Sequence, residues 1–229
     1  MKKVKWLTTV LVVASITLGI IGCSSPSSPS GSGNGGTQQG GANGGNHGEQ
    51  PEGGTQGAVV PEMVFVKGGT VVGAKYSNLF EGVFIAGRTV TLSDFYMGKY
   101  EVTQEEYASV MAGQKVTVAG VEYELESNPN YCTKDSTSYT LFNGDEQKKR
   151  PVEGVTWYDS VWYCNALSEK EGLTKAYNIK VTQVKQESGK TGYYIYSADV
   201  TLNKNANGYR LPTGAEWEYA ARGGDPTKD

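Results

Sequence analysis

The feature that most constrains the fold of this chain is a long polar tract near the N-terminus. Residues 24–57 are mostly glycine, serine and other small or polar residues, and none has a large apolar side chain. Such a segment buries too little apolar surface to offset the conformational entropy lost on folding. We therefore predict that residues 23–60 form a disordered, Gly/Ser-rich tether and that residues 61–229 make up the folded part.

The first 22 residues have the pattern of a secretory signal peptide. Three lysines precede an apolar run over residues 7–21, which is shorter than the ~20 residues needed to span a bilayer. The run ends in IIGC, which resembles the lipobox of bacterial lipoproteins, whose cysteine is lipidated and becomes the mature N-terminus. We therefore predict removal of residues 1–22, lipidation of Cys23 and anchoring in the bacterial cell envelope, at the outer membrane or surface. The alternatives are an ordinary signal peptide or an uncleaved anchor with an incidental cysteine.

Composition argues against several functional classes. The formal net charge is −3 and no basic cluster follows the first residues, so nucleic-acid binding has no electrostatic support. The only histidine, His47, lies in the polar tract, which excludes a Ser-His-Asp or Cys-His catalytic system from the folded part. A histidine-based zinc site is excluded for the same reason. The two remaining cysteines, Cys132 and Cys164, have a spacing that fits no metal-binding motif.

Short apolar runs bounded by glycine predict strands and hairpins. Residues 63–73 are expected to form two strands that turn at Gly68-Gly69, and residues 115–125 a hairpin that turns at Ala119-Gly120. The remaining expected features are strands at residues 83–86 and 89–92, which flank Gly87, and a hairpin turn near Ser188-Gly189.

Three segments share a pattern that marks the start of a helix, in which a threonine precedes an acidic residue by three positions. The threonine hydroxyl can accept a hydrogen bond from the first helical turn, and the acid can accept one from the threonine N–H. The patterns begin at Thr103, Thr156 and Thr213, and each is followed by apolar residues at helical spacing and then by glycine. Together with short strands and no βαβ alternation, they predict an irregular α+β domain.

Four longer segments occur in a characteristic order: MVFVKGGT (63–70), YEVTQEEY (100–107), RPVEGVTWYDSVWYCNALSEKEGL (150–173) and GYRLPTGAEWEYAARGG (208–224). Together they resemble the formylglycine-generating enzyme family, also called the sulfatase-modifying factor family. The resemblance implies an irregular, C-type-lectin-like fold that is incomplete at the C-terminus, so the chain is expected to be the N-terminal portion of such a domain. The helices that begin at Thr156 and Thr213 are then expected to leave apolar faces exposed.

The resemblance also implies where the chemistry of this family lies. In the enzymes, the calcium ligands and the two copper-binding catalytic cysteines follow the region matched here, beyond residue 229. We therefore expect no catalytic, metal-binding or cofactor-binding residue in this chain. A copper-binding pair of Cys132 and Cys164 is the alternative, because thiolate is a ligand that Cu(I) prefers. We expect instead that Cys132 is a small core side chain and that Cys164 lies on an apolar helix face, where some relatives form a disulfide with a downstream cysteine.

Other polar and aromatic residues have a structural and a functional interpretation. The acids Glu216 and Glu218 could form a catalytic pair, but we expect a helix cap and a salt bridge, with Arg210 and Arg222 as partners. Residues 144–150 are expected to be a solvated loop. An aromatic group could line a binding cleft or pack in the core; its members are Trp157, Tyr158, Trp162, Tyr163 and Trp217.

Two functions follow from these expectations. The first is a non-catalytic surface lipoprotein that uses its domain for binding or display, with a protein or carbohydrate ligand. The second is the N-terminal fragment of an oxidase that converts cysteine to formylglycine in sulfatases. In both cases the chain as given is expected to be inactive as an enzyme and to contact the membrane through Cys23.

Overall fold

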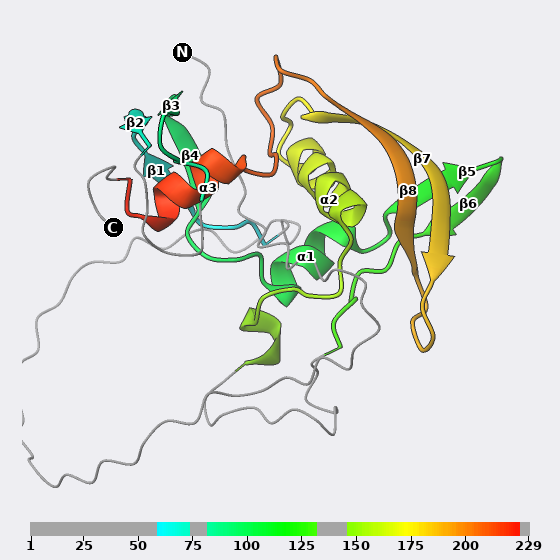
Figure 1. Cartoon of the computed structure of the whole chain (residues 1–229). Coiled ribbons are helices and arrows are strands. Elements are labelled where there is room, and N and C mark those ends of the chain that lie inside the picture. Colours follow the sequence, from blue (N-terminus) through cyan, green and yellow to red (C-terminus); the bar gives the residue numbers. More distant parts are fainter. Residues whose placement is uncertain (1–58, 74–81, 132–145, 225–229) are drawn as a thin grey trace, which may run out of the picture.

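The computed structural model describes residues 59–73, 82–131 and 146–224. Within these ranges the chain forms helices and two-stranded antiparallel sheets, which confirms the predicted α+β class (Figure 1). The elements are β1 (Met63–Val66), β2 (Thr70–Val72), β3 (Thr89–Thr91), β4 (Phe95–Gly98), α1 (Gln104–Met111), β5 (Lys115–Val118), β6 (Val121–Glu124), the 3-10 helix η1 (Gln147–Lys149), α2 (Trp157–Lys170), β7 (Tyr177–Gln186), β8 (Tyr193–Leu202) and α3 (Gly214–Ala221).

Several sequence predictions concern other parts of the chain. The predicted signal peptide, the lipidation site Cys23 and most of the tether lie outside the described residues, as does Cys132. None of the helices in the described ranges has the length and apolar character needed to cross a bilayer.

All three predicted helix starts are confirmed. Thr103, Thr156 and Thr213 are the N-caps of α1, α2 and α3, and each forms the reciprocal pair of hydrogen bonds with the acid three residues later. This arrangement satisfies backbone donors that would otherwise lack partners in the first turn. The predicted glycines follow each helix, at Gly113, Gly172 and Gly223, with φ values of 73°, 66° and 78°.

Two of the predicted hairpins are also confirmed. Strands β5 and β6 pair with Val118 opposite Val121, and the two turn residues, Ala119 and Gly120, both have positive φ. This is the turn geometry that matches the natural twist of a hairpin. The longer strands β7 and β8 pair from Tyr177–Leu202 to Gln186–Tyr193, with an irregularity in register near Gln183.

The predicted hairpin at residues 63–73 is wrong in its pairing. Both strands exist, but β1 pairs with β4 and β2 pairs with β3, so one pair is nested inside the other. Gly68 does not turn the chain there. A Cβ atom at this position would lie 2.2 Å from the Leu92 carbonyl oxygen, so the glycine allows two backbones to approach closely. The Gly68 N–H donates to the Asp94 carboxylate over 2.8 Å.

The predicted strand at residues 83–86 is not formed. This segment bends and turns before β3, with the Arg88 N–H donating to the Ile85 carbonyl over 3.1 Å. Its apolar residues serve the core instead of a sheet, because Phe84 is only 1% exposed. The following prediction, a strand near residues 89–92, is confirmed as β3.

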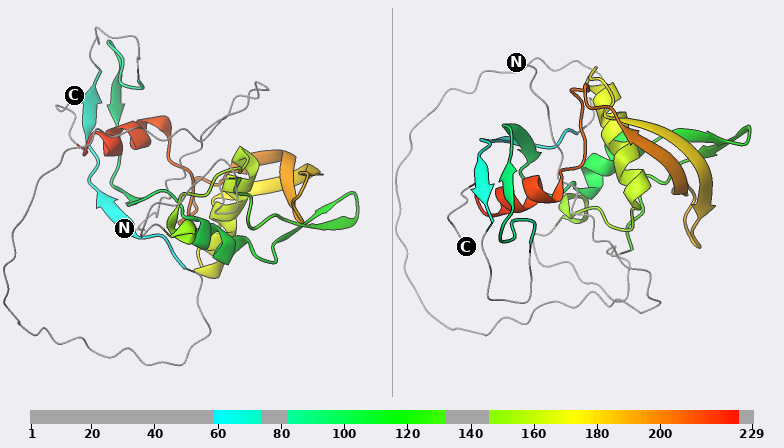
Figure 2. Two further views of the ribbon diagram at one scale, coloured as in Figure 1. Left: turned by 90° about the horizontal axis from the view of Figure 1, so that it is seen from below. Right: turned by 45° about the horizontal axis from the view of Figure 1, so that its top comes forward.

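Buried side chains form two clusters, which lie on opposite sides of the molecule (Figures 1 and 2). The larger core lies among α1, α2 and the hairpins β5–β6 and β7–β8, and it includes Met111, Val161, Leu167 and Ile195. The smaller core lies between α3 and the sheets of β1 to β4; its buried members are Val71, Phe84, Phe95, Met97 and Tyr219.

The expectation of exposed apolar helix faces is correct for α3 and wrong for α2. Val161, Cys164 and Leu167 of α2 are each 0% exposed, because β7 and β8 cover that face of the helix. On α3, by contrast, Trp217 is 46% exposed.

Candidate binding sites

A shallow depression on the surface, here called the Trp217 depression, lies between α3 and the β1–β4 sheet. Val64, Val66 and Met97 form its floor. Side chains alternate along a strand, so Val64 and Val66 point to the same face of β1, and Met97 lies opposite Val64 on β4. Its volume is about 310 Å³. The lining residues are Val64, Val66, Met97, Gly98, Lys99, Tyr100, Glu101, Trp217, Ala220 and Ala221.

Two aromatic side chains make the Trp217 depression accessible to a partner. Trp217 is 46% exposed and Tyr100 is 66% exposed, and both line the same hollow. Large apolar side chains grouped in an exposed concavity are a feature of interaction sites, because such patches are otherwise uncommon on soluble domains. The depression can therefore accept apolar side chains of a ligand.

A second hollow, here called the charged groove, continues from the Trp217 depression. The two share Lys99, Tyr100 and Glu101, and the groove has a volume of about 850 Å³. Its walls carry charges of both signs, including an ion pair of 3.2 Å between Lys99 Nζ and Glu62 Oε1. The complete lining is Val59, Val60, Pro61, Glu62, Lys99, Tyr100, Glu101, Thr103, Glu106, Lys149 and Pro151.

Helix α3 is held in place by a partly buried ion pair. The two guanidinium nitrogens of Arg210 donate to the two carboxylate oxygens of Glu216 over 3.0 and 2.9 Å. Glu216 also accepts from the backbone N–H of Thr213 over 2.7 Å. Burial lowers the pKa of Arg210 to about 10, and the Glu216 carboxylate opposes this effect. The predicted roles of Glu216 as a cap and Arg210 as its partner are therefore confirmed.

The second predicted acid on α3 is also a structural residue. Glu218 Oε1 accepts from Arg222 Nη2 over 2.6 Å, and its other oxygen accepts from the backbone N–H of Val83. These bonds connect α3 to the turn that places Phe84 in the smaller core. Both carboxylates of the supposed acid pair are thus occupied by structural partners.

The predicted aromatic group does not form one cleft. Tyr163 is buried and stacks on Tyr107 with ring centroids 5.3 Å apart, whereas Trp157 packs edge-on against Tyr158 at the start of α2. Trp162 and Trp217 line separate hollows. Tyr100 was not singled out from the sequence, since nothing local marks its exposure.

The segment predicted as a solvated loop is more ordered than expected over its described residues. Residues 147–149 form η1, and Lys149 Nζ lies 3.1 Å from Glu105 Oε2 on α1. Gln147 Nε2 donates to the Gln104 side chain over 2.9 Å. The loop is therefore fixed against α1, although its lysines remain largely exposed.

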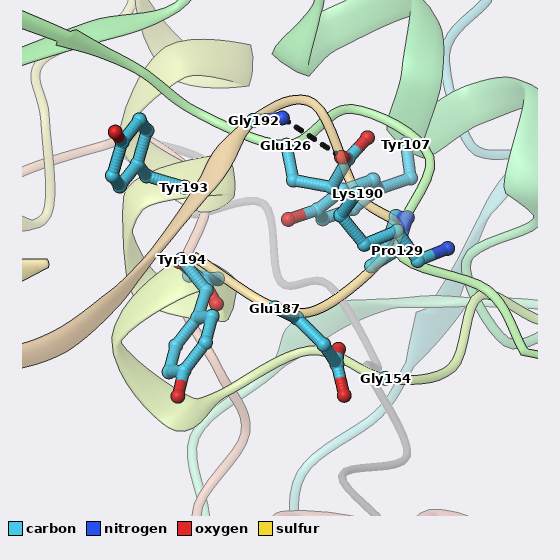
Figure 3. A pocket seen from close by; sticks show the side chains of 10 residues that line it. Tyr107, Glu126, Pro129, Gly154, Glu187, Lys190, Gly192, Tyr193 and Tyr194 are labelled. Atoms are coloured by element: carbon cyan, nitrogen blue, oxygen red, sulfur yellow. Dashed lines mark hydrogen bonds between the residues drawn. The ribbon is translucent and has the colours of Figure 1, made fainter. Parts of the chain in front are cut away.

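An internal cavity lies beneath the β7–β8 turn (Figure 3). Its volume is about 20 Å³, which suits a single water molecule. One wall includes the buried Asp159, which accepts from the Ile195 N–H over 2.8 Å, and burial raises the pKa of this carboxyl group. Another wall is fixed by Gly192, whose N–H donates to Glu126 over 3.1 Å. The hydrogen bonds of its walls hold the β7–β8 hairpin in place, and the cavity itself is too small for a ligand larger than water.

Cys164 lies in the larger core, as the sequence predicts. Its side chain is 0% exposed and carries a free thiol, and burial raises the pKa of this thiol well above its usual value. A protonated, enclosed thiol is a poor nucleophile and a poor copper ligand. Within the described ranges, no group of three or more His, Cys, Asp or Glu side chains is arranged to hold a metal ion. Enclosed in this way, Cys164 does not fit a copper site, whereas Cys132 lies outside the described residues.

Comparison with known proteins identifies the family. A curated relative, chaperone protein LppX of Paenibacillus barcinonensis, is 40% identical over 171 residues, which span 75% of this chain and 49% of the relative. Two solved structures, CarF and Treponema denticola variable protein 1, are 26% and 28% identical. Each alignment covers 72% of this chain, with 57% and 58% of the other chains and TM-scores of 0.43 and 0.44, respectively.

The family model described as the sulfatase-modifying factor enzyme 1-like domain matches residues 49–229. The match includes all four segments on which the resemblance was based. This chain therefore belongs to the family of sulfatase-modifying factor enzyme 1-like domains.

Proposed function

We propose that this chain is a lipid-anchored protein of the bacterial envelope whose domain binds extended or unfolded polypeptides without catalysing a reaction on them. The observation that carries the proposal is the Trp217 depression, where Trp217 and Tyr100 are 46% and 66% exposed over an apolar floor. Such a surface can hold the apolar side chains that an unfolded polypeptide exposes.

The charged groove supports the choice of a polypeptide. Lys99 and Lys149 lie on its walls together with Glu62, Glu101 and Glu106. A groove lined by both positive and negative side chains does not favour a polymer that carries only one kind of charge. A polypeptide has side chains of both charges, which can pair with the opposite charges along the groove. The relative LppX is named a chaperone protein, which supports a polypeptide as the ligand of the present domain.

Anchoring at Cys23 would place this surface at the envelope. The tether of residues 23–60 is rich in glycine and serine, and linkers of this composition behave as flexible coils. The domain would then reach clients some distance from the lipid. No catalytic residue is needed for this function, which agrees with the enclosed position of Cys164.

The experiment is an aggregation assay with the full chain reconstituted in lipid nanodiscs. Chemically denatured citrate synthase is diluted into buffer with or without the nanodiscs, and light scattering is followed. The wild type should suppress aggregation, and Trp217→Ala and Tyr100→Ala should each lose most of that effect. Trp157→Ala is the matched control, because Trp157 is 42% exposed and does not line the depression. Equal activity of Trp217→Ala and the wild type would contradict the proposal.

The family itself favours a second candidate, in which this chain is part of a formylglycine-generating oxidase. The chain spans about half the length of the curated relative that it matches, so residues outside it could supply the reaction. The test is mass spectrometry of a cysteine-containing sulfatase peptide after incubation with the chain. Formylglycine above the no-enzyme control, lost in Cys132→Ala or Cys164→Ala, would favour the oxidase and contradict a non-catalytic role.

A further inference from the structure

A separate cavity lies on the opposite core, along one side of α2. Trp162, Asn165, Ala166 and Glu169 are spaced three, four and seven residues apart, so they share one face of the helix. Together with Gln114 and a segment at the start of β7, they enclose a cavity of about 330 Å³, here called the Trp162 pocket. Its other lining residues are Lys175, Tyr177, Asn178 and Ile179.

The indole of Trp162 is held at the edge of its ring. Its Nε1–H donates to Gln114 Oε1 over 3.1 Å. Gln114 is itself fixed by its backbone, whose N–H donates to the Met111 carbonyl and whose carbonyl accepts from the Leu125 N–H. Because this bond uses the edge of the half-buried ring, a ring face can still serve as an apolar contact. The Nε2 group of Gln114 has no partner among the described residues and remains able to donate.

The rim of the pocket supplies further polar groups. Glu169 and Lys175 form an ion pair of 2.9 Å, and their side chains are 64% and 48% exposed. Asn178, on β7, has an exposed side-chain amide. Its Nδ2 donates to Thr201 Oγ1 over 3.5 Å, which leaves its second N–H and its oxygen able to bond a ligand. Asn165 does not share this role, because its side chain already binds the backbone N–H and carbonyl of Tyr177. It is part of the wall.

These groups favour one class of ligand. The charges of Glu169 and Lys175 cancel, so this pair favours neither an anionic nor a cationic ligand. These groups suit a ligand ring with an apolar C–H face and hydroxyl groups around its edge. The aromatic side chain can contact the C–H face, and the amide, carboxylate and ammonium groups can bond the hydroxyls. A volume of about 330 Å³ lies at the lower end of the range for small-molecule sites. We propose that the Trp162 pocket binds a neutral mono- or disaccharide, with Trp162 under the sugar ring and Gln114, Glu169, Lys175 and Asn178 at its hydroxyls.

The test uses the full chain in lipid nanodiscs and four disaccharides: cellobiose, maltose, lactose and N,N′-diacetylchitobiose. Binding is measured by saturation-transfer-difference NMR and by titration calorimetry. At least one sugar should bind, and Trp162→Ala should weaken that binding by about tenfold or more. Glu169→Gln should weaken it less, because an amide still accepts a hydrogen bond at that position.

Two control variants separate this site from the polypeptide surface. Trp157→Ala, on the same helix but outside the pocket, and Trp217→Ala should both bind the sugar as the wild type does. The far-UV circular dichroism spectrum of Trp162→Ala should match that of the wild type. If Trp162→Ala does not fold, Gln114→Ala is used in its place and should also weaken sugar binding. No binding of any of the four sugars at about 10 mM would overturn the proposal, as would unchanged affinity in folded Trp162→Ala. Either result leaves the aggregation assay unaffected, so failure of one proposal is distinguishable from failure of the other.

Discussion

The ion pair between Arg210 and Glu216 should contribute more to stability than any exposed ion pair of the domain. Their side chains are 15% and 11% exposed, and Glu216 accepts two bonds from Arg210 and two from Thr213. Removing one partner of a buried pair costs about 3–5 kcal/mol, because the other charge stays buried without compensation. Both groups retain some exposure, so the lower end of this range applies.

The expected magnitudes follow from the bonds that each variant removes. Glu216→Ala should lower the free energy of unfolding by about 4 kcal/mol. About 3 kcal/mol comes from the partly buried guanidinium, which loses its carboxylate and keeps its bond to the Leu211 carbonyl, and about 1 kcal/mol comes from the lost cap. Arg210→Ala should cost about 2 kcal/mol, because Glu216 keeps its bonds from Thr213. The double variant should be no less stable than Glu216→Ala, which gives a coupling free energy of at least about 2 kcal/mol.

The assay is urea unfolding at pH 7, followed by tryptophan fluorescence in a Cys23→Ser background. Trp217 is adjacent to Glu216 in α3 and reports on the helix directly. The control cycle uses Lys115 and Glu122, which form a 2.7 Å pair with side chains 49% and 61% exposed. Exposed pairs of this kind contribute little, so no measurable coupling is expected there. Coupling below about 0.5 kcal/mol for Arg210 and Glu216 would refute the reasoning.

Three further predictions concern single positions. Gly208→Ala should lower stability by about 1–3 kcal/mol in thermal unfolding, since its Cβ would lie 2.4 Å from the Thr174 carbonyl oxygen; an unchanged midpoint would contradict this close approach. In a Cys23→Ser, Cys132→Ser variant, Cys164 is the only cysteine, and its thiol should not react with a thiol reagent between pH 7 and 9. Burial raises the pKa of this thiol and keeps it protonated. The thiol should react in urea, and fast reaction in the folded chain would show that it is accessible. Labelled palmitate should enter the wild type and not Cys23→Ser, and equal labelling of the two would exclude lipidation at that residue.

Features set by a few neighbouring residues were predictable from the sequence. A capping box needs four residues, and those that begin at Thr103, Thr156 and Thr213 formed as expected. The hairpin at Ala119-Gly120 was also correct, because its turn residues lie between two apolar runs that pair directly. Local physical chemistry decides such features before tertiary contacts are made.

Features set by distant residues were not predictable in the same way. Gly68-Gly69 has the composition of a turn, yet β1 pairs with β4, and Gly68 is required by the nearby Leu92 carbonyl. The Trp217 depression depends on Tyr100 and Trp217, which lie more than 100 residues apart in the sequence. Hydrophobic periodicity cannot show that a tertiary contact between such distant residues exists.

The nested pairing of β1 with β4 and β2 with β3 has a consequence for the order of folding. The hairpins β5–β6 and β7–β8 close over short loops, which is fast, whereas the nested pairs and α3 need contacts between distant parts of the chain. Tyr219, which completes the smaller core, is synthesised more than 100 residues after Phe95, its neighbour in that core. During translation, the apolar side chains of β2 to β4 therefore stay exposed to solvent until α3 has been synthesised. In that interval the nascent chain is most prone to aggregation or to binding by other proteins.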